Sequence, residues 1–532
     1  MLIRLNLFSL FIVVISLNIN SQVWNPDLGN GRYKNPVLYA DYSDPDVIRI
    51  NDDFYLTSSS FNCVPGLPVL HSKDLINWTI IGHVFNKQPP FEVFNKPQHG
   101  NGCWAPSIRY HNDEFYIYYG DPDYGIYMTK SKNPAGPWES VHLVKEAKGW
   151  IDPCPFWDDD GKAYLVHAFA GSRSGIKSII VINKMNSEGT KLLDDGVLVF
   201  DGHENHPTIE GPKMYKRNGY YYIFAPAGGV TNGWQTVLRS KNVYGPYEAK
   251  IVMEQGTTSV NGPHQGAWIE LSSGESWFMH FQDMEAYGRI VHLQPLVWKD
   301  DWPVIGNDKD GDGKGEPVLT YQKPDVGKKF PKISPIVSDE FNSNKLGLQW
   351  QWHANNKPEW AFTFGSKGFL RLYCVPVPDD YNLWNVPNLL LQKLPSPEFT
   401  ATAKVTFTSS FKDEKCGLLI MGMDYSCLCL KNAGDNFVIS HTICIEANGN
   451  GKEEETANIK IDKIPVYLRV KVREGAECEF YYSTDGKNYS QVGNTFTAKR
   501  GRWIGAKVGI FATREGTVND SGFADFDWFR IE

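Results

Sequence analysis

The sequence predicts an all-β protein in which a five-bladed β-propeller is followed by a β-sandwich. Three observations support this prediction. Five segments share one strand-turn-strand plan, a turn-rich acidic stretch follows Gly306, and short alternating strand patterns fill the chain from Ser338 to its end. A chain of 532 residues is too long for one ordinary core, so two large domains fit its length.

The repeat indicates the propeller. Four of the repeated segments start with a small or acidic residue and the fifth starts with a histidine. Each continues as an apolar strand, passes through a tight polar turn and ends in an aromatic-rich strand. The five segments start at Asp44, Ala105, Asp152, Glu210 and His264. Their turns are typical of hairpins: Asn51-Asp52, Asn112-Asp113, Asp159-Asp160-Gly161, Asn218-Gly219 and Ser273-Gly274. With a further pair of strands in each unit of roughly fifty residues, we expect five blades in residues 35–306. A sandwich with chance hairpins would not give five matching units.

Residues 307–337 are predicted to be a linker. Asp308, Asp310 and Asp312 have the spacing of a calcium loop, but Leu319 stands at the twelfth position, where an EF-hand needs Glu. We therefore expect a solvated turn, with a structural calcium ion as the alternative. Alternating runs at 399–407 and 466–472 predict a separate, jelly-roll-like β-sandwich over residues 338–532.

The composition restricts the partners. The net charge is −8, and no basic stripe or Lys/Arg block is present, which argues against nucleic acid and anionic membranes. A neutral substrate fits better, and we expect a monomer. Nine cysteines are an odd number, so at least one thiol is unpaired, and buried thiols are the simplest interpretation.

The N-terminus predicts export. Arg4 is followed by an apolar run over residues 5–17, which is the pattern of a signal peptide and too short for a membrane span. We assign residues 1–21 to the signal peptide. The mature protein is then expected in the periplasm of a Gram-negative cell, or secreted from another cell, and not inserted in a membrane.

Acidic residues mark the expected site. The first strand of every blade lies at the propeller axis, so the starts of the five segments should converge on one funnel, bringing together Asp44, Asp152 and Glu210, with His264 beside them. Three acids around one axis repel each other, which is typical of a functional site. Hydrolysis of a glycosidic bond needs two carboxyl groups, one protonated and one ionised, and a third can raise the pKa of the acid.

Several motifs resemble glycoside hydrolase family 43. They include residues 35–46 (Asn-Pro-Val-Leu-Tyr-Ala-Asp-Tyr-Ser-Asp-Pro-Asp), Asp152-Pro153, residues 209–212, residues 71–78 and residues 104–107. Residues 339–342, 346–352 and 387–392 resemble the β-sandwich that often follows in this family. The resemblance covers the whole propeller and implies an inverting glycosidase acting on plant oligosaccharides or polysaccharides, with no required cofactor.

The resemblance also implies individual roles. Asp44 would be the general base that activates water, Glu210 the general acid, and Asp152 the carboxylate that raises the pKa of the acid and orients it. Asp41 and Asp46 rival Asp44, and only the family motif separates them. His264 matches a histidine that contacts a hydrated calcium ion in many relatives, and a hydrogen-bonded core histidine is its alternative.

The remaining candidates would bind the sugar. Arg289 matches an arginine that reaches a substrate hydroxyl, with a plain salt bridge as the alternative, and Trp104 and Phe61 are candidate walls of the pocket that could instead be core. The sandwich could bind sugar independently or close one edge of the pocket.

Four functions are compared. The first is an exo-acting α-L-arabinofuranosidase that trims side chains of xyloglucan or arabinoxylan. The second is a β-D-xylosidase acting on xylo-oligosaccharides, or one enzyme with both activities. A retaining, fructan-cleaving propeller would be expected to have Asn before its early Asp, whereas Ser43 precedes Asp44 here. The non-enzyme alternative is a carbohydrate-binding propeller, which would not need all three acids.

Overall fold

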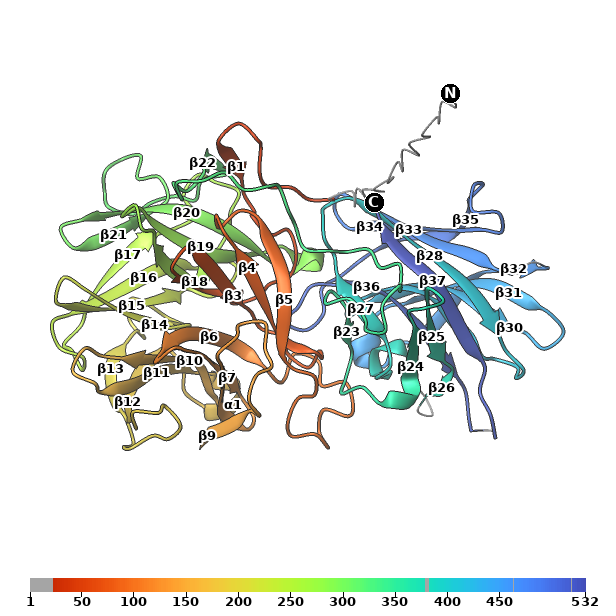
Figure 1. The fold of residues 1–532 in the computed structure, drawn as a ribbon, viewed down its shortest axis with the longest axis horizontal. Helices are drawn as coiled ribbons and strands as arrows, with labels where there is room; N and C mark the ends of the chain where they lie inside the picture. The colour runs from red at the N-terminus through yellow and green to blue at the C-terminus, as the bar shows by residue number, and fades with distance from the viewer. Residues whose placement is uncertain (1–22, 378–381, 463, 518) are drawn as a thin grey trace, which may run out of the picture.

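The computed structural model describes residues 23–377, 382–462, 464–517 and 519–532 (Figure 1). The signal peptide expected at residues 1–21 lies outside them. Within the described residues the chain is almost entirely β-structure, and its helical elements are one short α-helix and four 3₁₀ turns: α1 (Gly171–Ser174), η1 (Glu285–Tyr287), η2 (Pro358–Trp360), η3 (Leu383–Asn385) and η4 (Ala447–Gly449). This confirms the predicted all-β class.

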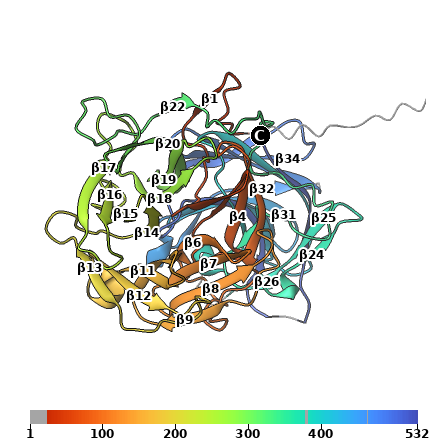
Figure 2. The same cartoon turned by 60° about the vertical axis from the view of Figure 1, so that its left-hand side comes forward.

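Five four-stranded antiparallel sheets form the predicted propeller, and Figure 2 shows them following one another around a ring. Blade 1 is β2 (Asp46–Ile50), β3 (Asp53–Thr57), β4 (Gly66–Ser72) and β5 (Trp78–Phe85). Blade 2 is β6 (Trp104–His111), β7 (Glu114–Asp121), β8 (Gly125–Ser131) and β9 (His142–Glu146). Blade 3 is β10 (Trp150–Trp157), β11 (Ala163–Phe169), β12 (Ile179–Met185) and β13 (Val197–Asp201).

The last two blades repeat this order. Blade 4 is β14 (Lys213–Arg217), β15 (Tyr220–Ala227), β16 (Trp234–Ser240) and β17 (Glu248–Met253). Blade 5 is β18 (His264–Glu270), β19 (Ser276–Asp283), β20 (Arg289–Lys299) and β21 (Trp302–Ile305). In every blade the strands lie in chain order, with the first strand innermost, and β18 contacts β2 where the ring closes.

The predicted hairpin turns form as expected. Asn51, Asn112 and Asn218 adopt φ values of 56°, 48° and 51° between the first and second strands of their blades. Asparagine tolerates this left-handed conformation better than most residues, which is why the turns could be read from the sequence.

The segment expected to be a linker does more than connect the domains. Part of it, β22 (Thr320–Gln322), pairs with β1 (Arg32–Lys34) near the N-terminal end of the described chain. Between β1 and blade 1, Leu38 forms a β-bridge with Val291 of β20. Both ends of the propeller sequence are therefore fastened beside blade 5, which helps to close the ring.

The C-terminal domain is a sandwich of two sheets. The eight-stranded sheet contains β23 (Gln351–Trp352), β26 (Val375–Pro376), β27 (Leu390–Lys393), β29 (Lys415–Met421), β30 (Tyr425–Asn432), β31 (Phe437–Cys444), β32 (Glu453–Ile461) and β36 (Lys507–Arg514). The seven-stranded sheet contains β24 (Ala361–Phe364), β25 (Phe369–Tyr373), β28 (Phe399–Thr408), β33 (Val466–Arg473), β34 (Glu477–Ser483), β35 (Ser490–Thr497) and β37 (Phe523–Ile531). This confirms the predicted sandwich.

The hydrophobic core of the sandwich extends onto the propeller at the contact between the two domains. The cluster that fills the sandwich also includes propeller residues Tyr39, Val64 and Tyr287, and Val64 exchanges backbone hydrogen bonds with Trp352 of β23. The Tyr287 hydroxyl reaches into the sandwich, where it donates to the carbonyls of Pro397 and Arg473 and accepts from the Ala476 amide. A continuous apolar contact with paired backbone groups fixes the orientation of the sandwich relative to the propeller.

The cysteines of the described residues form no disulfide bonds. All nine cysteines lie in the described part of the chain and are buried free thiols, as the sequence indicated. No described helix has both the length and the apolar character needed to cross a bilayer.

Tyr287→Phe is expected to destabilise the domain contact. The substitution keeps the ring but leaves the buried Ala476 amide without its acceptor, which should cost about 1–3 kcal/mol. A thermal unfolding curve should show a lower melting temperature. Tyr110→Phe is the control, because the exposed hydroxyl of Tyr110 makes only a 3.5 Å contact with Asp113. Equal melting temperatures for the two variants would contradict the role of Tyr287.

Candidate active site

A pocket of about 500 Å³ opens at one end of the propeller axis. All seven residues expected at the site line it: Asp44, Phe61, Trp104, Asp152, Glu210, His264 and Arg289. They come from blades 1, 2, 3, 4 and 5 and from the loops that enter them, so the radial arrangement brings together residues far apart in the chain.

A left-handed bend at the entry to each innermost strand directs these side chains. Asp44, Ala105, Asp152, Gly211 and Gln265 have φ between 34° and 60°. In β6, β10 and β18 the pairing register also shifts at the bend, as at a β-bulge. Such strained conformations cluster at functional sites, where they redirect side chains.

The positions of the bends show that two of the repeats align differently from the register that the sequence indicated. Glu210 and His264 each stand one residue before the bend of their blade, whereas Asp44 and Asp152 occupy the bend itself. Blades 4 and 5 are therefore offset by one residue from the register that the sequence indicated. Both positions reach the pocket, because the bulge turns two successive side chains toward the axis, as with Ile151 and Asp152.

Asp44 is buried and fully hydrogen-bonded. Its Oδ1 accepts from Arg289 Nη1 at 2.9 Å, and its Oδ2 accepts from the Ser59 hydroxyl at 2.5 Å. Ser59 Oγ in turn accepts from the Ala105 amide of blade 2 at 2.7 Å. The carboxylate is therefore oriented by groups from three blades, and the guanidinium of Arg289 compensates its charge.

Asp152 and Glu210 form a second acidic group. Asp152 Oδ2 accepts from the Gly211 amide at 2.7 Å, which places it beside Glu210. Burial raises the pKa of Asp152 well above its usual value, and the neighbouring charge of Glu210 raises it further. Asp152 therefore retains its proton more readily than an isolated aspartate would. Glu210 is the more accessible member, with a quarter of its side chain exposed.

His264 lies within hydrogen-bonding distance of Glu210. Its Nε2 lies 3.1 Å from Glu210 Oε1, while its buried Nδ1 has no hydrogen-bond partner among the described residues. One free ring nitrogen fits a water molecule, or a hydrated cation held through water, but the site offers no further set of protein ligands. The described residues contain one group of three or more potential metal ligands, and His264 is not in it.

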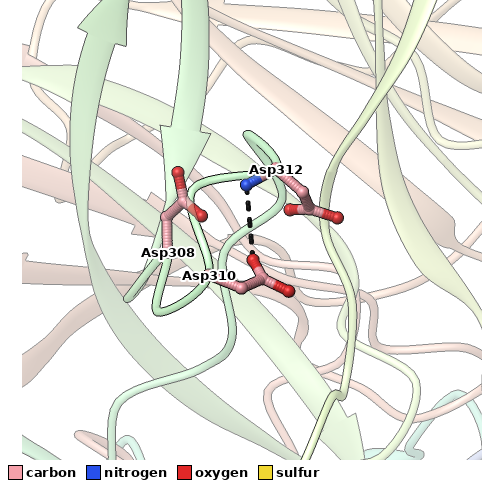
Figure 3. A group of neighbouring side chains, drawn as sticks. All are labelled: Asp308, Asp310 and Asp312. Atoms are coloured by element: carbon pink, nitrogen blue, oxygen red, sulfur yellow. Dashed lines mark hydrogen bonds between the residues drawn. The ribbon is translucent and has the colours of Figure 1, made fainter.

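That group is Asp308, Asp310 and Asp312, whose ligand oxygens lie within 4.8 Å of one another (Figure 3). The loop lies outside the pocket and is mostly exposed. Lys299 contacts Asp308 at 3.1 Å and Lys314 contacts Asp312 at 3.1 Å, so lysines compensate two of the three charges. Both expectations for this loop, a solvated turn and a structural calcium ion, therefore stay predictions.

The sandwich supplies a wall that the sequence did not identify. Trp503, in the loop between β35 and β36, lines the pocket and makes an edge contact with Trp104 at 6.2 Å between ring centroids. Phe61 contacts the other side of Trp104 at 6.5 Å. The sandwich therefore closes one edge of the pocket. An exposed tryptophan between two glycines was the available signal, but nothing in the sequence related it to residue 104.

Asp46 and Asp41, the other two candidates for the general base, lie outside the pocket. Asp46 is fully buried, forms an ion pair with Arg109 at 2.6 Å and accepts from the Ile108 amide. Asp41 lies at the contact between the domains. Neither lines the pocket. A second, mostly apolar cavity between the domains contains none of the three acids of the pocket, so it is not the candidate site.

Comparisons with known proteins show the family to which this chain belongs. The family model described as glycosyl hydrolases family 43 matches residues 33–303, and that of the β-xylosidase C-terminal concanavalin A-like domain matches residues 338–532. Among solved structures, the GH43 BlXynB protein from Bacillus licheniformis is similar with a TM-score of 0.80 at 27% identity, over 94% of this chain and 99% of that chain.

Three curated relatives are similar over nearly their whole length. A "Putative beta-xylosidase" of Xylanibacter ruminicola is 40% identical over 93% of this chain and 89% of its own, and a β-xylosidase of Formosa agariphila is 34% identical over 95% and 91%. The non-reducing end α-L-arabinofuranosidase BoGH43B of Bacteroides ovatus is 28% identical over 95% and 96%.

Asp152→Asn is expected to change how stability depends on pH. Because the folded-state pKa of Asp152 is raised above 3.8, folding retains a proton that the unfolded chain releases, so this residue lowers stability as pH rises through that interval. Asparagine does not titrate and can still accept from the Gly211 amide. The melting temperature of the variant relative to wild type should therefore increase from about pH 4 to about pH 8. Parallel curves would contradict the raised pKa.

Proposed function

Because the chain belongs to glycosyl hydrolase family 43, we propose that it is an inverting, exo-acting enzyme that releases terminal pentose residues from plant hemicellulose. The observation that carries this proposal is the separation of the pocket acids into two groups. Asp44 is bonded to Arg289 and Ser59, while burial and the neighbouring Glu210 raise the pKa of Asp152. An ionised base and a proton donor are the two groups that glycosidic hydrolysis needs.

In the proposed reaction Asp44 removes a proton from a water molecule, which attacks the anomeric carbon. Glu210 delivers a proton to the departing oxygen from the opposite side of the sugar. Asp152 stays at the Gly211 amide beside Glu210, in the position proposed for the carboxylate that orients the acid. Arg289, already oriented by Asp44, is placed to contact a sugar hydroxyl.

The shape of the pocket supports exo action. Trp104, Phe61 and Trp503 wall a cavity of about 500 Å³, which suits a terminal sugar better than the middle of a polymer. Aromatic faces also suit the apolar faces of a sugar ring.

The sugar is proposed from the relatives. The two most identical of the three relatives above are named as β-xylosidases, at 40% and 34% identity, which supports terminal β-D-xylose as the main substrate. The arabinofuranosidase at 28% identity supports α-L-arabinofuranose as the second candidate. The sequence motifs had favoured arabinose, and an enzyme that accepts both sugars is compatible with either relative.

The remaining properties are also proposals. We propose that the protein is exported, on the basis of the apolar N-terminal run. We also propose that it acts as a monomer. The proposed chemistry uses protein side chains and water, without a required metal, and a calcium ion at the acidic loop or, through water, at His264 would have a structural role.

The substrate and the stereochemistry can be measured together. We expect the wild-type protein to hydrolyse aryl β-D-xyloside at least as fast as aryl α-L-arabinofuranoside, and proton NMR should show the inverted anomer as the first product. A first product of unchanged configuration would exclude the assigned roles of Asp44 and Glu210. Binding of xylo-oligosaccharides without turnover would instead favour the carbohydrate-binding propeller.

Glu210→Gln should lower activity according to the leaving group. An activated aryl glycoside needs little protonation, so kcat should fall less on it than on a xylo-oligosaccharide, by a factor of about 10 to 100 between the two. Glu204→Gln, an exposed glutamate six residues earlier, is the control and should match wild type on both substrates. Equal losses on both substrates would exclude Glu210 as the acid.

A further inference from the structure

Asp41 is a buried carboxylate outside the pocket that accepts three hydrogen bonds. The Ser43 hydroxyl donates to Oδ1 at 2.8 Å, the Arg289 amide donates to Oδ1 at 3.0 Å, and the Gly505 amide donates to Oδ2 at 3.0 Å. Only 3% of the residue is exposed. The partners come from the entry to blade 1, from blade 5 and from the sandwich, so one side chain joins three separate segments.

Each of these segments carries a residue of the pocket. Ser43 precedes Asp44 in the chain. Arg289 itself lines the pocket and bonds to Asp44 through its guanidinium. Gly505 follows two residues after Trp503, the wall supplied by the sandwich. A shift of the Asp41 side chain would therefore be transmitted to the pocket through Ser43, Arg289 and Gly505.

The backbone around Asp41 is packed too tightly for side chains. A Cβ atom on Gly288 would lie 2.5 Å from the Asp41 Cγ, and one on Gly505 would lie 2.6 Å from the Gly288 amide nitrogen. Next to this contact the Ala506 amide donates to the Ala286 carbonyl at 2.7 Å. Two glycines at closest approach and a cross-domain hydrogen bond show that the loop from the sandwich is seated directly on the turn before Arg289.

The conformation of Trp503 depends on this contact between the loop and the turn before Arg289. Its φ is 64°, a left-handed conformation that is unfavourable for a bulky residue. It is also nearly half exposed, so burial alone does not hold it. Its ring contacts are an edge contact with Trp104 and a guanidinium contact with Arg289 at 5.9 Å. The hydrogen bond from Gly505 to Asp41 is the nearest fixed anchor of the loop.

We propose that Asp41 is a positioning residue that locks the Trp503 loop of the sandwich onto the turn bearing Arg289 and so sets the shape of the sugar pocket. The sandwich thereby acts as a part of the active site through this carboxylate. The inference rests on the proposed glycosidase activity for its kinetic consequence, but the coupling between Asp41 and the loop can be measured without that activity.

Asp41→Asn is the most informative variant, because it keeps the size of the side chain. An amide offers one oxygen and one NH₂ group, whereas all three partners of Asp41 are donors. If the oxygen faces Ser43 and Arg289, the NH₂ group faces the Gly505 amide, and the loop loses its anchor. We expect KM for the aryl pentoside to rise about tenfold, with a smaller change in kcat, because the pocket wall moves while the acids stay in place.

A matched control separates positioning from general destabilisation. Asp339 also accepts three hydrogen bonds, from the Phe341 and Gly347 amides and from the Trp350 indole, but lies in the sandwich away from the pocket. Asp339→Asn should lower the melting temperature and leave KM within twofold of wild type. In a Trp503→Ala background, Asp41→Asn should raise KM less than twofold further, because the wall it positions is already gone. Additive effects of these two substitutions would overturn the proposal.

Hydrogen exchange provides a test that does not depend on catalysis. Peptides covering residues 499–506 should exchange faster in Asp41→Asn than in wild type, and at the wild-type rate in Asp339→Asn. If Asp41→Asn fails to fold, Gly505→Ala keeps the carboxylate but forces the loop from Gly288, and it should give the same faster exchange and higher KM. Unchanged exchange would overturn the coupling, whereas faster exchange in a protein without pentosidase activity would overturn only the proposed function.

Discussion

The left-handed bend at the entry to each innermost strand is the constraint on which the pocket depends. A regular strand would alternate its side chains between the two faces of the blade, so only every second residue could point along the axis. The bends at Asp44, Ala105, Asp152, Gly211 and Gln265 interrupt that alternation. At the four non-glycine positions they cost conformational energy, which the surrounding blades offset by holding the backbone in place. The chemistry is therefore concentrated where the sheet geometry is least regular.

Placing three carboxyl groups in one pocket creates an electrostatic cost that the protein distributes unequally. Asp44 receives a guanidinium and a hydroxyl, whereas Asp152 receives one backbone amide and the repulsion of Glu210. The same residue type therefore meets two environments, one suited to a carboxylate and one suited to a carboxylic acid. This division, more than the presence of acids as such, is what relates the pocket to glycosidic hydrolysis.

The sandwich and the propeller function as one structural unit. The sandwich core includes propeller residues at the domain contact, Tyr287 hydrogen-bonds inside the sandwich, and Trp503 of the sandwich lines the pocket. Asp41 lies at the point where these connections meet the catalytic strands. A domain attached in this way contributes to the shape of the site, and its loops affect which sugars fit.

The sequence by itself determined the hairpin period, the five blades, the sandwich and the three acids, because turn chemistry, strand alternation and short motifs are local properties. It also indicated Arg289, Trp104, Phe61 and His264, all of which line the pocket. Only the tertiary structure showed that Glu210 and His264 are offset by one residue. It also showed that Asp46 is buried in an ion pair with Arg109, and that Trp503 lines the pocket. These features depend on how distant segments pack against one another, and no local pattern encodes the distance between residues that meet only after the ring closes and the second domain docks.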